Sequence, residues 1–338
     1  IEPMAEQIAT LSRWLSLLAK LPTASALPSP PSSHAFGALK ALRPLCERGE
    51  PGLLDTLVGE GAGVLCAVVA VASKSIDAID ADKSADTAST GLLQWGHLRQ
   101  NALSCLVCVA SNEARCTQLV HGGTDTASSA VCACCVAMLH SKSSRADMEG
   151  MRLCANLLRN MSMPVANRLV LGLTTGVFTG LLSQCAHKEP NVAALIAATL
   201  RLLVEGCAPN ATRVASAPSA FARIVKLDLI HLHPHARVEL ARLVCLTISQ
   251  ADKGSIDEST LDVKALRFGA FLLGSNHAVL LHEAVAALKV ARSRAGCSWD
   301  GSAISVPVGG RETPLPQVLR TLIEAGSLSA TECEELLE

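Results

Sequence analysis

Apolar residues recur along this chain at the three- and four-residue spacing that places them on one face of a helix. The first such stripe predicts a helix over residues 4–21 and is made of Ile8, Leu11, Leu15 and Leu18. Further apolar runs predict helices at 35–47, 51–58 and 61–75. A segment rich in proline and serine, 27–33, predicts a loop after the first helix. The pattern therefore favours an N-terminal part made of helices.

Polar segments interrupt this pattern at several places. Residues 77–90 carry four aspartates without apolar periodicity, which predicts a loop between helices. Further loops or irregular segments are predicted at 210–218, 249–259 and 298–316. The stretch 315–337 is predicted to hold a short helix and then Ser329–Glu332, whose residues match a helix-capping pattern.

Two stretches repeat one sequence pattern 45 residues apart, Leu157–Arg168 and Leu202–Arg213. A leucine pair, a proline, an alanine and the final arginine coincide, and each stretch follows an apolar helical run. Helical self-similarity with a period of roughly 40–47 residues is typical of HEAT and armadillo arrays. Asn101–Cys116 matches less regularly, at an offset of 51 or 52 residues. The sequence therefore predicts an all-α fold, a right-handed α-solenoid of armadillo/HEAT-like repeats.

The repeat register predicts a single solenoid over residues 1–338. Residues 1–90 are expected to form less regular helices, and 92–300 about five repeats. The repeats are placed at 92–140, 147–187, 189–230, 234–275 and 277–300. Residues 301–338 are expected to form an irregular segment and a C-terminal capping helix, because an array must cover its exposed apolar end.

The composition agrees with close packing of helices. Hydrophobic residues make up 49% of the chain, but aromatic residues make up only 2% and tyrosine is absent. Alanine, leucine and valine therefore fill the interior. A net charge of −1 and the scarcity of stacking side chains argue against a nucleic-acid partner. No apolar run reaches the ~20 residues that a membrane helix requires, so no integral membrane segment is predicted.

The 14 cysteines lie mostly inside apolar helical runs such as 133–136 and 243–246. No signal-like segment is recognisable, so they are predicted to be reduced, packed thiols of a cytoplasmic protein. The alternative is a four-thiolate zinc site built from the Cys105-x-x-Cys108 and Cys132-x-x-Cys135 pairs. Packing is favoured because both pairs lie in helical runs rather than in polar turns.

Other patterns point only weakly to chemistry. Three histidines alternate within His231–His235 around a proline that separates two helices. They are predicted to be loop residues, with a chelating turn as the alternative. Gly59–Gly63 lacks the preceding strand and the lysine of a phosphate-binding loop. No serine elbow or metalloprotease helix is present. The sequence therefore predicts no enzyme active site, no metal and no cofactor.

The inner helices of the predicted array carry a row of polar residues. In an armadillo unit the last helix lines the inner groove, and residues four apart share a helix face. The row over 152–160 maps by the 45-residue shift onto 197–205, and onto 100–108 in the first repeat. Directional polar groups suit contacts with a partner, and the alternative is an ordinary solvated face. The candidate protein-binding residues are Arg152, Asn156, Asn160, Arg201, Glu205 and Arg242.

A more specific resemblance begins at Leu158-Arg159-Asn160-Met161-Ser162. Armadillo proteins commonly end a unit with an "LRNL" or "LSNL" phrase followed by a proline or asparagine turn. Together with Asn112–Gly123, Thr199–Val204 and His282–Leu288, the run Leu157–Arg168 resembles the small-GTPase guanine-nucleotide dissociation stimulators (SmgGDS). The resemblance covers about residues 95–295, loosely and with gaps.

The resemblance implies an armadillo array that binds small GTPases of the Rho and Rap type through its concave groove. Such proteins engage the switch region, destabilise bound nucleotide and escort GTPases with a basic, prenylatable tail. Asn160 stands where the family places a groove asparagine, and Arg201 and Glu205 would join it at the switch region. The acidic residues of 77–86 would attract the basic tail. Glu205 interrupts the asparagine ladder, which argues against a nuclear-import adaptor.

The sequence thus predicts a monomeric protein-interaction solenoid that binds small GTPases as a nucleotide-exchange stimulator or chaperone. The alternative is a general armadillo scaffold that binds a helical or extended segment of a cytoskeletal or trafficking partner. A thiol- or metal-dependent enzyme is a third alternative, and it rests on the number of cysteines alone.

Overall fold

The computed structural model of the chain describes residues 13, 15–16, 33–81, 88–121, 125–141, 147–217, 220–227, 232–252, 254–256, 263–275, 277–295 and 299–337. They divide into two compact units, 1–180 and 181–338. The predicted helix at 4–21, apart from three residues, lies outside the described part, as does nearly all of the predicted loop at 27–33.

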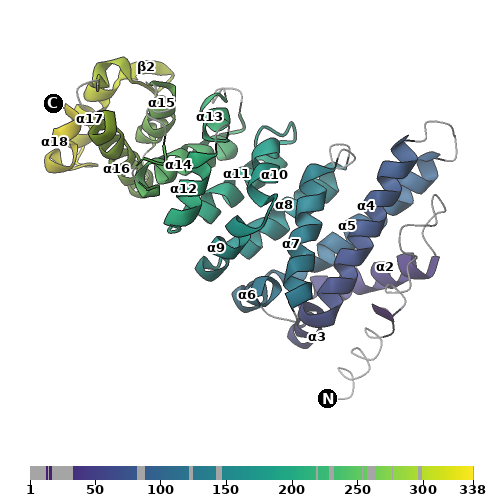
Figure 1. The fold of residues 1–338 in the computed structure, drawn as a ribbon. Coiled ribbons are helices and arrows are strands. Elements are labelled where there is room, and N and C mark those ends of the chain that lie inside the picture. The colour runs from purple at the N-terminus through teal and green to yellow at the C-terminus, as the bar shows by residue number, and fades with distance from the viewer. Residues whose placement is uncertain are drawn as a thin grey trace. The chain divides into compact units, whose positions relative to one another are not determined.

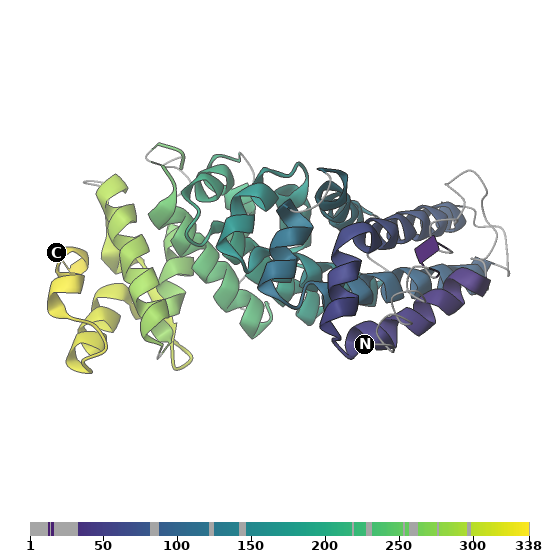
Figure 2. The ribbon, with the colours of Figure 1, turned by 90° about the horizontal axis from the view of Figure 1, so that it is seen from below.

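Unit 1 is built from helices of unequal length (Figure 1). The long helix α4 packs against α5 and α7, and α5 packs in turn against α2 and α8. Figure 2 shows α4 and α5 side by side. The short helix α6 contacts α7, α8 and α9. The elements are α2 (Ser33–Glu47), α3 (Pro51–Thr56), the π-helical turn η1 (Leu57–Gly61), α4 (Ala62–Ala81), α5 (Ala88–Val109), α6 (Glu113–His121), α7 (Asp125–His140), α8 (Met148–Ser162), α9 (Val165–Leu173) and α10 (Val177–Gln184), which continues into unit 2.

The helices predicted at 35–47, 51–58 and 61–75 are confirmed, but the loop predicted at 77–90 is wrong in its described part. Helix α4 continues to Ala81, and α5 already begins at Ala88. Ile76 and Ile79 are buried, and their spacing extends the apolar face of α4 past the first aspartate. Asp77, which lies between them, is on the exposed side of the helix and does not end it.

A buried ion pair fixes the start of α8 in the core of unit 1. The Arg99 side chain is 0% exposed, and its Nε and Nη2 atoms donate to Asp147 Oδ2 at 3.0 and 2.7 Å. Asp147 is also the N-cap of α8, because its Oδ1 accepts from the Gly150 backbone N–H at 2.8 Å. Gln100 Nε2 donates to the same Oδ1 at 2.8 Å. One carboxylate therefore joins α5 to α8.

Asparagine side chains bond to carbonyl groups at the ends of two long helices, those that end at Ser162 and Val204. Asn167 Nδ2 donates to the carbonyl oxygen of Met161 at 2.8 Å, and Asn210 Nδ2 to that of Leu203 at 2.8 Å. Arg168 Nε donates to the Ser162 carbonyl at 3.3 Å. The last carbonyls of a helix lack intrahelical partners, and these side chains supply donors. The two helices thus end in the same way, through asparagines that lie 43 residues apart and that the 45-residue alignment does not superimpose.

Unit 2 places three long helices next to one another, with α11 against α14 and α14 against α16. Both α11 and α14 begin with a proline, which the first turn of a helix tolerates. The elements are α11 (Pro190–Val204), α12 (Ala208–Ser216), α13 (Ala220–Val225), α14 (Pro234–Gln250), α15 (Val263–Phe271), the 3-10 turn η5 (Leu272–Gly274), α16 (Ala278–Ala295), the 3-10 turn η7 (Gly301–Ala303), β1 (Ser305–Val308), β2 (Arg311–Pro314), α17 (Leu315–Glu324) and α18 (Ala330–Leu337).

The loop predicted at 210–218 is wrong, because helix α12 occupies most of it. Pro209 lies in the first turn, where a proline does not interrupt the hydrogen-bond ladder. Ala211 and Val214 are buried on one side of this helix. A short amphipathic helix with a proline at its start therefore resembled a loop in sequence.

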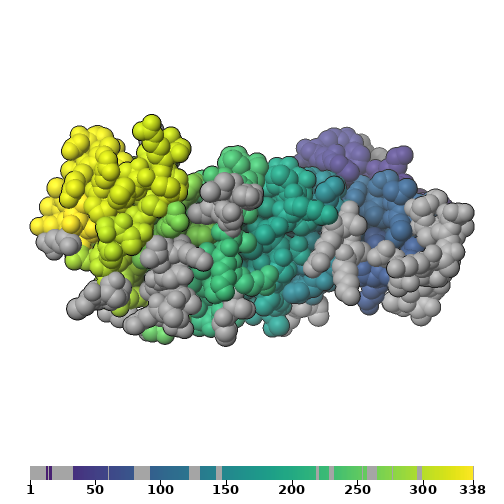
Figure 3. Space-filling view, turned by 90° about the horizontal axis from the view of Figure 1, so that it is seen from above, coloured from purple at the N-terminus to yellow at the C-terminus, as the bar shows by residue number. Residues whose placement is uncertain are grey.

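The C-terminal segment contains a small β-hairpin that the helical pattern did not predict. Strands β1 and β2 are antiparallel, and Val308 pairs with Arg311 across the turn. Gly309 and Gly310 form this turn with φ of 57° and 80°, which glycine adopts without strain. Strand β1 packs on α15, and Val306 is buried. In Figure 3 the C-terminal elements (yellow) form one continuous part of the visible surface.

The capping pattern predicted at Ser329–Glu332 is confirmed. Ser329 Oγ accepts from the Glu332 backbone N–H at 3.2 Å, and Glu332 Oε2 accepts from the Ser329 backbone N–H at 2.9 Å. This reciprocal pair begins α18. Cys333 and Leu336 are buried, and α18 packs against α16.

One described helix is long and apolar enough to cross a membrane by length and composition alone, over Ala62–Ile79. Two bent helix pairs would also pass if each were counted as one span. In the structure 56% of the Ala62–Ile79 window is buried. Helix α4, which contains it, packs against α5 and α7, so much of this apolar surface contacts other helices.

Candidate functional site

Three of the predicted binding residues meet in unit 2. Arg201 lies in the last turn of α11, and Glu205 is the residue that ends this helix. Arg201 Nη1 donates to Glu205 Oε2 at 2.7 Å, while Arg242 Nη2, from α14, approaches Glu205 Oε1 at 3.4 Å. A single carboxylate thus lies between guanidinium groups from two neighbouring helices.

Two further glutamates, which the sequence argument missed, complete the arrangement. Arg201 Nε donates to Glu239 Oε2 at 2.6 Å. Arg242 donates through Nε and Nη2 to the two carboxylate oxygens of Glu283, at 2.8 and 2.6 Å, in a bidentate pair. We call the five residues the charged row, in the order Glu239, Arg201, Glu205, Arg242 and Glu283.

Two of the three carboxylates in the charged row are more exposed than its guanidinium groups. The Arg201 and Arg242 side chains are 13% and 16% exposed, whereas Glu205 and Glu239 are 33% and 24% exposed, and Glu283 is 15% exposed. The hydrogen bonds to Glu283 raise the pKa of Arg242, and the charges of Glu283, Glu239 and Glu205 act in the same direction. Three carboxylates against two guanidinium groups leave the row with one net negative charge. The negative charge of the row lies closest to solvent at Glu205 and Glu239.

Tight packing beneath the row holds these side chains in place. The core side of α14 includes Leu240, Leu243 and Val244, each 0% exposed. Cys245 is also buried, and this burial raises the pKa of its thiol. Because α14 packs against both α11 and α16, the row stands on three helices with a common core. Such support favours a rigid binding surface.

The predicted residues of unit 1 lie on α8. The side chain of Arg152 pairs with Glu149 on the same helix, with two hydrogen bonds of 2.7 Å. This hydrogen bonding lowers the pKa of Glu149. Asn156 and Asn160 are partly exposed at the expected four-residue steps. Neither amide side chain has a hydrogen-bond partner among the described residues. The structure thus places all three on the open face of α8, and their role in binding stays a prediction.

The 45-residue shift carries only part of the row from α8 to α11. It places Arg201 and Glu205 on the open face, and both are partly exposed. It also places Ala197 there, but this residue is 0% exposed. In the first repeat Ser104 is buried, and Gln100 bonds to Asp147.

A sequence signal existed for one of the missed glutamates. Glu239 precedes Arg242 by three residues on a helix, a spacing that places both on one face. Glu283 follows Arg242 by 41 residues, which is close to the repeat length but does not by itself select a glutamate. Only the packing of α14 on α16 brings that pair together.

The neighbours of the cysteines differ from those that the zinc-site alternative requires. The free thiol of Cys105 forms a hydrogen bond with the thiol of Cys46, and that of Cys135 with the thiol of Cys154. These hydrogen bonds and burial raise the pKa of Cys105 and Cys135. Among the described residues, no group of three or more His, Cys, Asp or Glu side chains is arranged to hold a metal ion.

Of the three histidines in the predicted turn, His233 precedes α14 as its N-cap, and its ring lies 5.3 Å from that of His235. His231 lies outside the described residues.

Solved structures show the fold class. No family model matches the chain, and no curated protein matches it. The designed armadillo repeat protein YIII(Dq)4CqI aligns with a TM-score of 0.55 and 16% identity, covering 83% of this chain and 99% of that one. An engineered protein aligns with a TM-score of 0.54 and 20% identity, covering 82% and 98%.

A third structure is the designed armadillo repeat protein YIII(Dq.V1)4CPAF in complex with peptide (KR)4. Its TM-score is 0.54 at 16% identity, and the alignment covers 83% of this chain and 99% of that one. At such low identity these matches speak to the fold alone. They confirm the prediction of an all-α solenoid with armadillo-like repeats, to which the structure adds a β-hairpin.

Proposed function

We propose that this chain is a protein-binding armadillo scaffold whose charged row binds a basic segment of its partner. The observation that carries this proposal is the exposure of Glu205 and Glu239 above two less exposed guanidinium groups. Each carboxylate oxygen accepts more than one hydrogen bond, so a lysine or arginine of a partner would bond to the exposed side of Glu205 or Glu239 beside Arg201. The basic peptide in the complex of a designed armadillo protein supports the same choice of partner.

The ion pairs within the charged row favour recognition of a particular arrangement of cationic groups over general electrostatic attraction. The internal ion pairs already neutralise most of the row, so an incoming cation adds charge-assisted hydrogen bonds to preorganised carboxylates. Partly exposed pairs are screened by salt, and their effect is greatest on association rate and specificity. Binding is therefore expected to weaken as ionic strength rises.

The finer proposal concerns the identity of the partner. The resemblance to guanine-nucleotide dissociation stimulators supports small GTPases of the Rho or Rap type, with Asn160, Arg201 and Glu205 at the switch region. The chain would act in the cytoplasm as a monomer and perform no covalent chemistry. It would favour a GTPase conformation that binds nucleotide poorly, to the extent of its differential affinity for the two states. The alternative partner is a cytoskeletal or trafficking protein that offers a helical or extended segment.

The test measures binding and nucleotide release with purified Rho- and Rap-type GTPases, each with its basic tail intact or removed. We expect nanomolar to micromolar binding of the nucleotide-free form and faster release of fluorescent GDP. Removal of the tail should weaken binding at least about tenfold, or about 1.4 kcal/mol.

Glu205→Gln should weaken binding of the intact GTPase, because it removes the most exposed carboxylate. Both arginines keep a second carboxylate, Glu239 or Glu283, so the fold is expected to survive. The matched control is Glu324→Gln, an exposed glutamate on α17. Absence of binding to every GTPase tested would remove the GTPase proposal. Capture of a cytoskeletal or trafficking protein through Glu205 would then favour the alternative partner.

A further inference from the structure

Glu205, the most exposed carboxylate of the charged row, is the residue at which helix α11 ends. Its backbone N–H donates to the Arg201 carbonyl at 2.9 Å, but its ψ of 115° lies outside the helical range. Gly206 follows with a φ of 68°, a left-handed conformation that glycine adopts without strain. The chain therefore leaves the helix at Glu205, and helical geometry does not set the orientation of the peptide unit between Glu205 and Gly206.

The side chain of Gln250 holds this peptide unit from the neighbouring helix. Gly206 N–H donates to Gln250 Oε1 at 3.1 Å, and Gln250 is the last residue of α14. A peptide unit is planar, so its N–H and the preceding carbonyl turn together about the Cα–C bond of Glu205. The hydrogen bond from Gly206 therefore fixes the ψ angle of Glu205, and with it the backbone from which the carboxylate extends.

Helix α14 contacts Glu205 at a second point, through Arg242. Arg242 Nη2 approaches Glu205 Oε1 at 3.4 Å, the longest hydrogen bond of the charged row. Such a bond is weak, because N–H···O bonds are usually 2.7–3.2 Å long. Arg201, on the same helix as Glu205, is bonded to it at 2.7 Å and would retain the carboxylate if the backbone turned. The contact with Arg242 therefore depends on the backbone at Glu205 staying in place.

We propose that Gln250 is a positioning residue of the charged row and acts on a bound basic segment through Glu205. It keeps the Glu205 carboxylate between Arg201 and Arg242, so that the exposed side of this carboxylate faces the cationic groups of the partner. Gln250 carries no charge and needs no contact with the partner. This role rests on the function proposed for the charged row, because it concerns how one of the binding groups is held.

Calorimetric titration of the full chain with the peptide (KR)4 tests this role in a double-mutant cycle of Gln250→Met and Glu205→Gln. Methionine is close to glutamine in size but lacks the oxygen acceptor for the Gly206 N–H. Gln250→Met alone should weaken peptide binding about three- to tenfold, which is the usual effect of losing one hydrogen bond. In the Glu205→Gln background the same change should weaken binding less than about twofold, because the group through which Gln250 acts is already altered.

Thr212→Val is the matched control in unit 2. Thr212 Oγ1 accepts from the Asp252 backbone N–H at 3.0 Å, so this change removes a similar side-chain acceptor, just beyond the end of α14. It should leave (KR)4 binding unchanged. Urea denaturation of each variant shows that it is folded and that the two changes cost similar stability.

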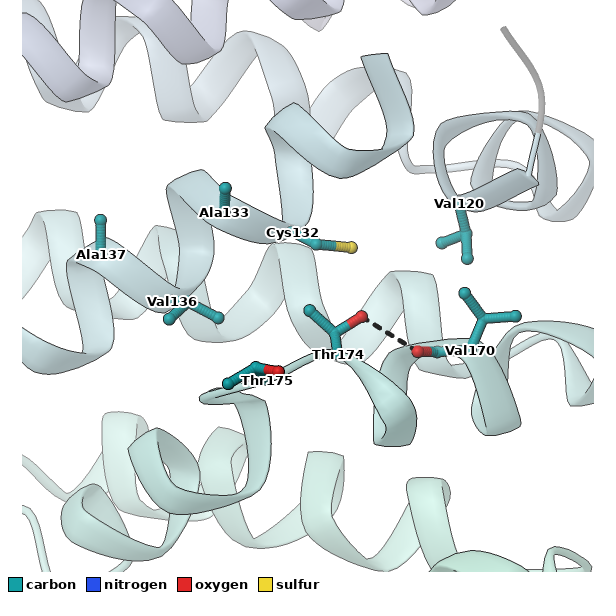
Figure 4. A pocket seen from close by; sticks show the side chains of 8 residues that line it. All are labelled: Val120, Cys132, Ala133, Val136, Ala137, Val170, Thr174 and Thr175. Carbon is teal, nitrogen blue, oxygen red and sulfur yellow. Dashed lines mark hydrogen bonds between the residues drawn. The ribbon is translucent and has the colours of Figure 1, made fainter. Parts of the chain in front are cut away.

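A second control comes from unit 1, where an open apolar cavity of about 520 Å³ lies between α7 and α9 (Figure 4). Among the described residues that line it, none is an aspartate or glutamate, and Thr174 Oγ1 donates to the Val170 carbonyl at 3.0 Å. A basic peptide would find no counter-charge there. Thr175→Val, at an exposed position of the lining, should therefore leave (KR)4 binding unchanged. A loss of binding in this variant would overturn both the positioning role and the proposed function.

Equal binding by Gln250→Met and the unaltered chain would overturn the positioning role. An equal loss in both backgrounds, or a similar loss in Thr212→Val, would overturn it as well. Equal binding by Glu205→Gln and the unaltered chain would remove the proposed function and the positioning role with it.

Hydrogen exchange at the Gly206 amide tests the positioning role without any peptide. Gln250→Met should speed this exchange at least about threefold, because the amide loses its acceptor, while Thr212→Val should leave it unchanged. Unchanged exchange in Gln250→Met would show that Gln250 does not hold this peptide unit, and it would overturn the inference whatever the result of the titration.

Discussion

Asp147 accepts hydrogen bonds from Arg99, Gln100 and the Gly150 backbone while its side chain is only 11% exposed. Asp147→Ala would leave the Arg99 guanidinium buried without a counter-charge and α8 without its cap. We expect a loss of about 3–5 kcal/mol in the free energy of unfolding, measured by urea denaturation. The control is Asp55→Ala, whose carboxylate is 62% exposed beside Arg115 and should cost less than about 1 kcal/mol. Similar losses in the two variants would contradict this account.

At Gly150, helix propensity and local contacts predict opposite effects of a change to alanine on stability. A glycine-to-alanine change inside a helix normally stabilises by about 1 kcal/mol. At position 150, however, an added Cβ would collide with the Asp147 carboxylate. Gly150→Ala should therefore lower the thermal midpoint. The comparison is Gly37→Ala in α2, where an added Cβ meets nothing within 4 Å. A higher thermal midpoint in both variants would show that the Asp147 carboxylate can move aside without loss of stability.

The buried thiols should make the folded chain less stable at alkaline pH. Burial raises the pKa of Cys132 from 9.0 to about 11, partly offset by a hydrogen bond with Thr174. The unfolded chain therefore loses this proton first, so stability is unaffected below about pH 8 and falls as the pH rises from about 9 to 11. One such thiol contributes a slope of at most about 1.4 kcal/mol per pH unit.

Cys132→Ala should make this slope shallower, measured by denaturation at several pH values under reducing conditions. Any cavity that it creates changes stability equally at every pH, so the comparison of slopes isolates the thiol. An unchanged slope would mean that Cys132 ionises as easily in the folded chain as in the unfolded one.

Among helices and strands, the capping box of α18 offers the sharpest local prediction. Ser329→Ala removes the acceptor for the Glu332 backbone N–H, and it should cost about 1 kcal/mol of local stability. Hydrogen exchange should then become faster in α18 but not in α14. Ser302→Ala, an exposed serine outside this cap, is the control. Unchanged exchange in α18 would indicate that packing on α16 alone holds this helix.

The elements that the sequence predicted well have strong, local signals. The apolar spacing before Glu47 and the Ser329–Glu332 pattern both depend on residues within one or two turns. The missed elements depend on context. Helix α12 begins with a proline that also suits a turn, and the hairpin around Gly309 is stabilised by packing on α15. Each strand of the hairpin has only four residues, which is too few for the spacing of apolar residues to distinguish a strand from a loop.

The candidate site was predictable only in part for the same reason. Spacing on one helix placed Arg152 on the open face of α8, and the repeat drew attention to Arg201. Their partners depend on which side chains of the next helix come within reach. Glu283 could therefore be identified as a partner of Arg242 only from the packing of α14 on α16. The repeat shift also placed Ala197 on the open face, where it is in fact buried, because sequence spacing alone does not show which turns of α11 its neighbours cover.

For the molecule as a whole, the two units offer surfaces of different chemistry. Unit 2 carries an ion network with three carboxylates, and unit 1 exposes three aliphatic side chains on α9, those of Val165, Leu169 and Leu173. The overall net charge of −1 conceals this difference.

The decisive measurement is calorimetric titration of the full chain with the peptide (KR)4. We expect saturable binding that weakens with added salt and falls at least about tenfold in Glu205→Gln, while Glu324→Gln binds like the unaltered chain. Absence of binding at low salt, or equal binding by Glu205→Gln and the unaltered chain, would contradict the claim that the charged row binds a basic segment.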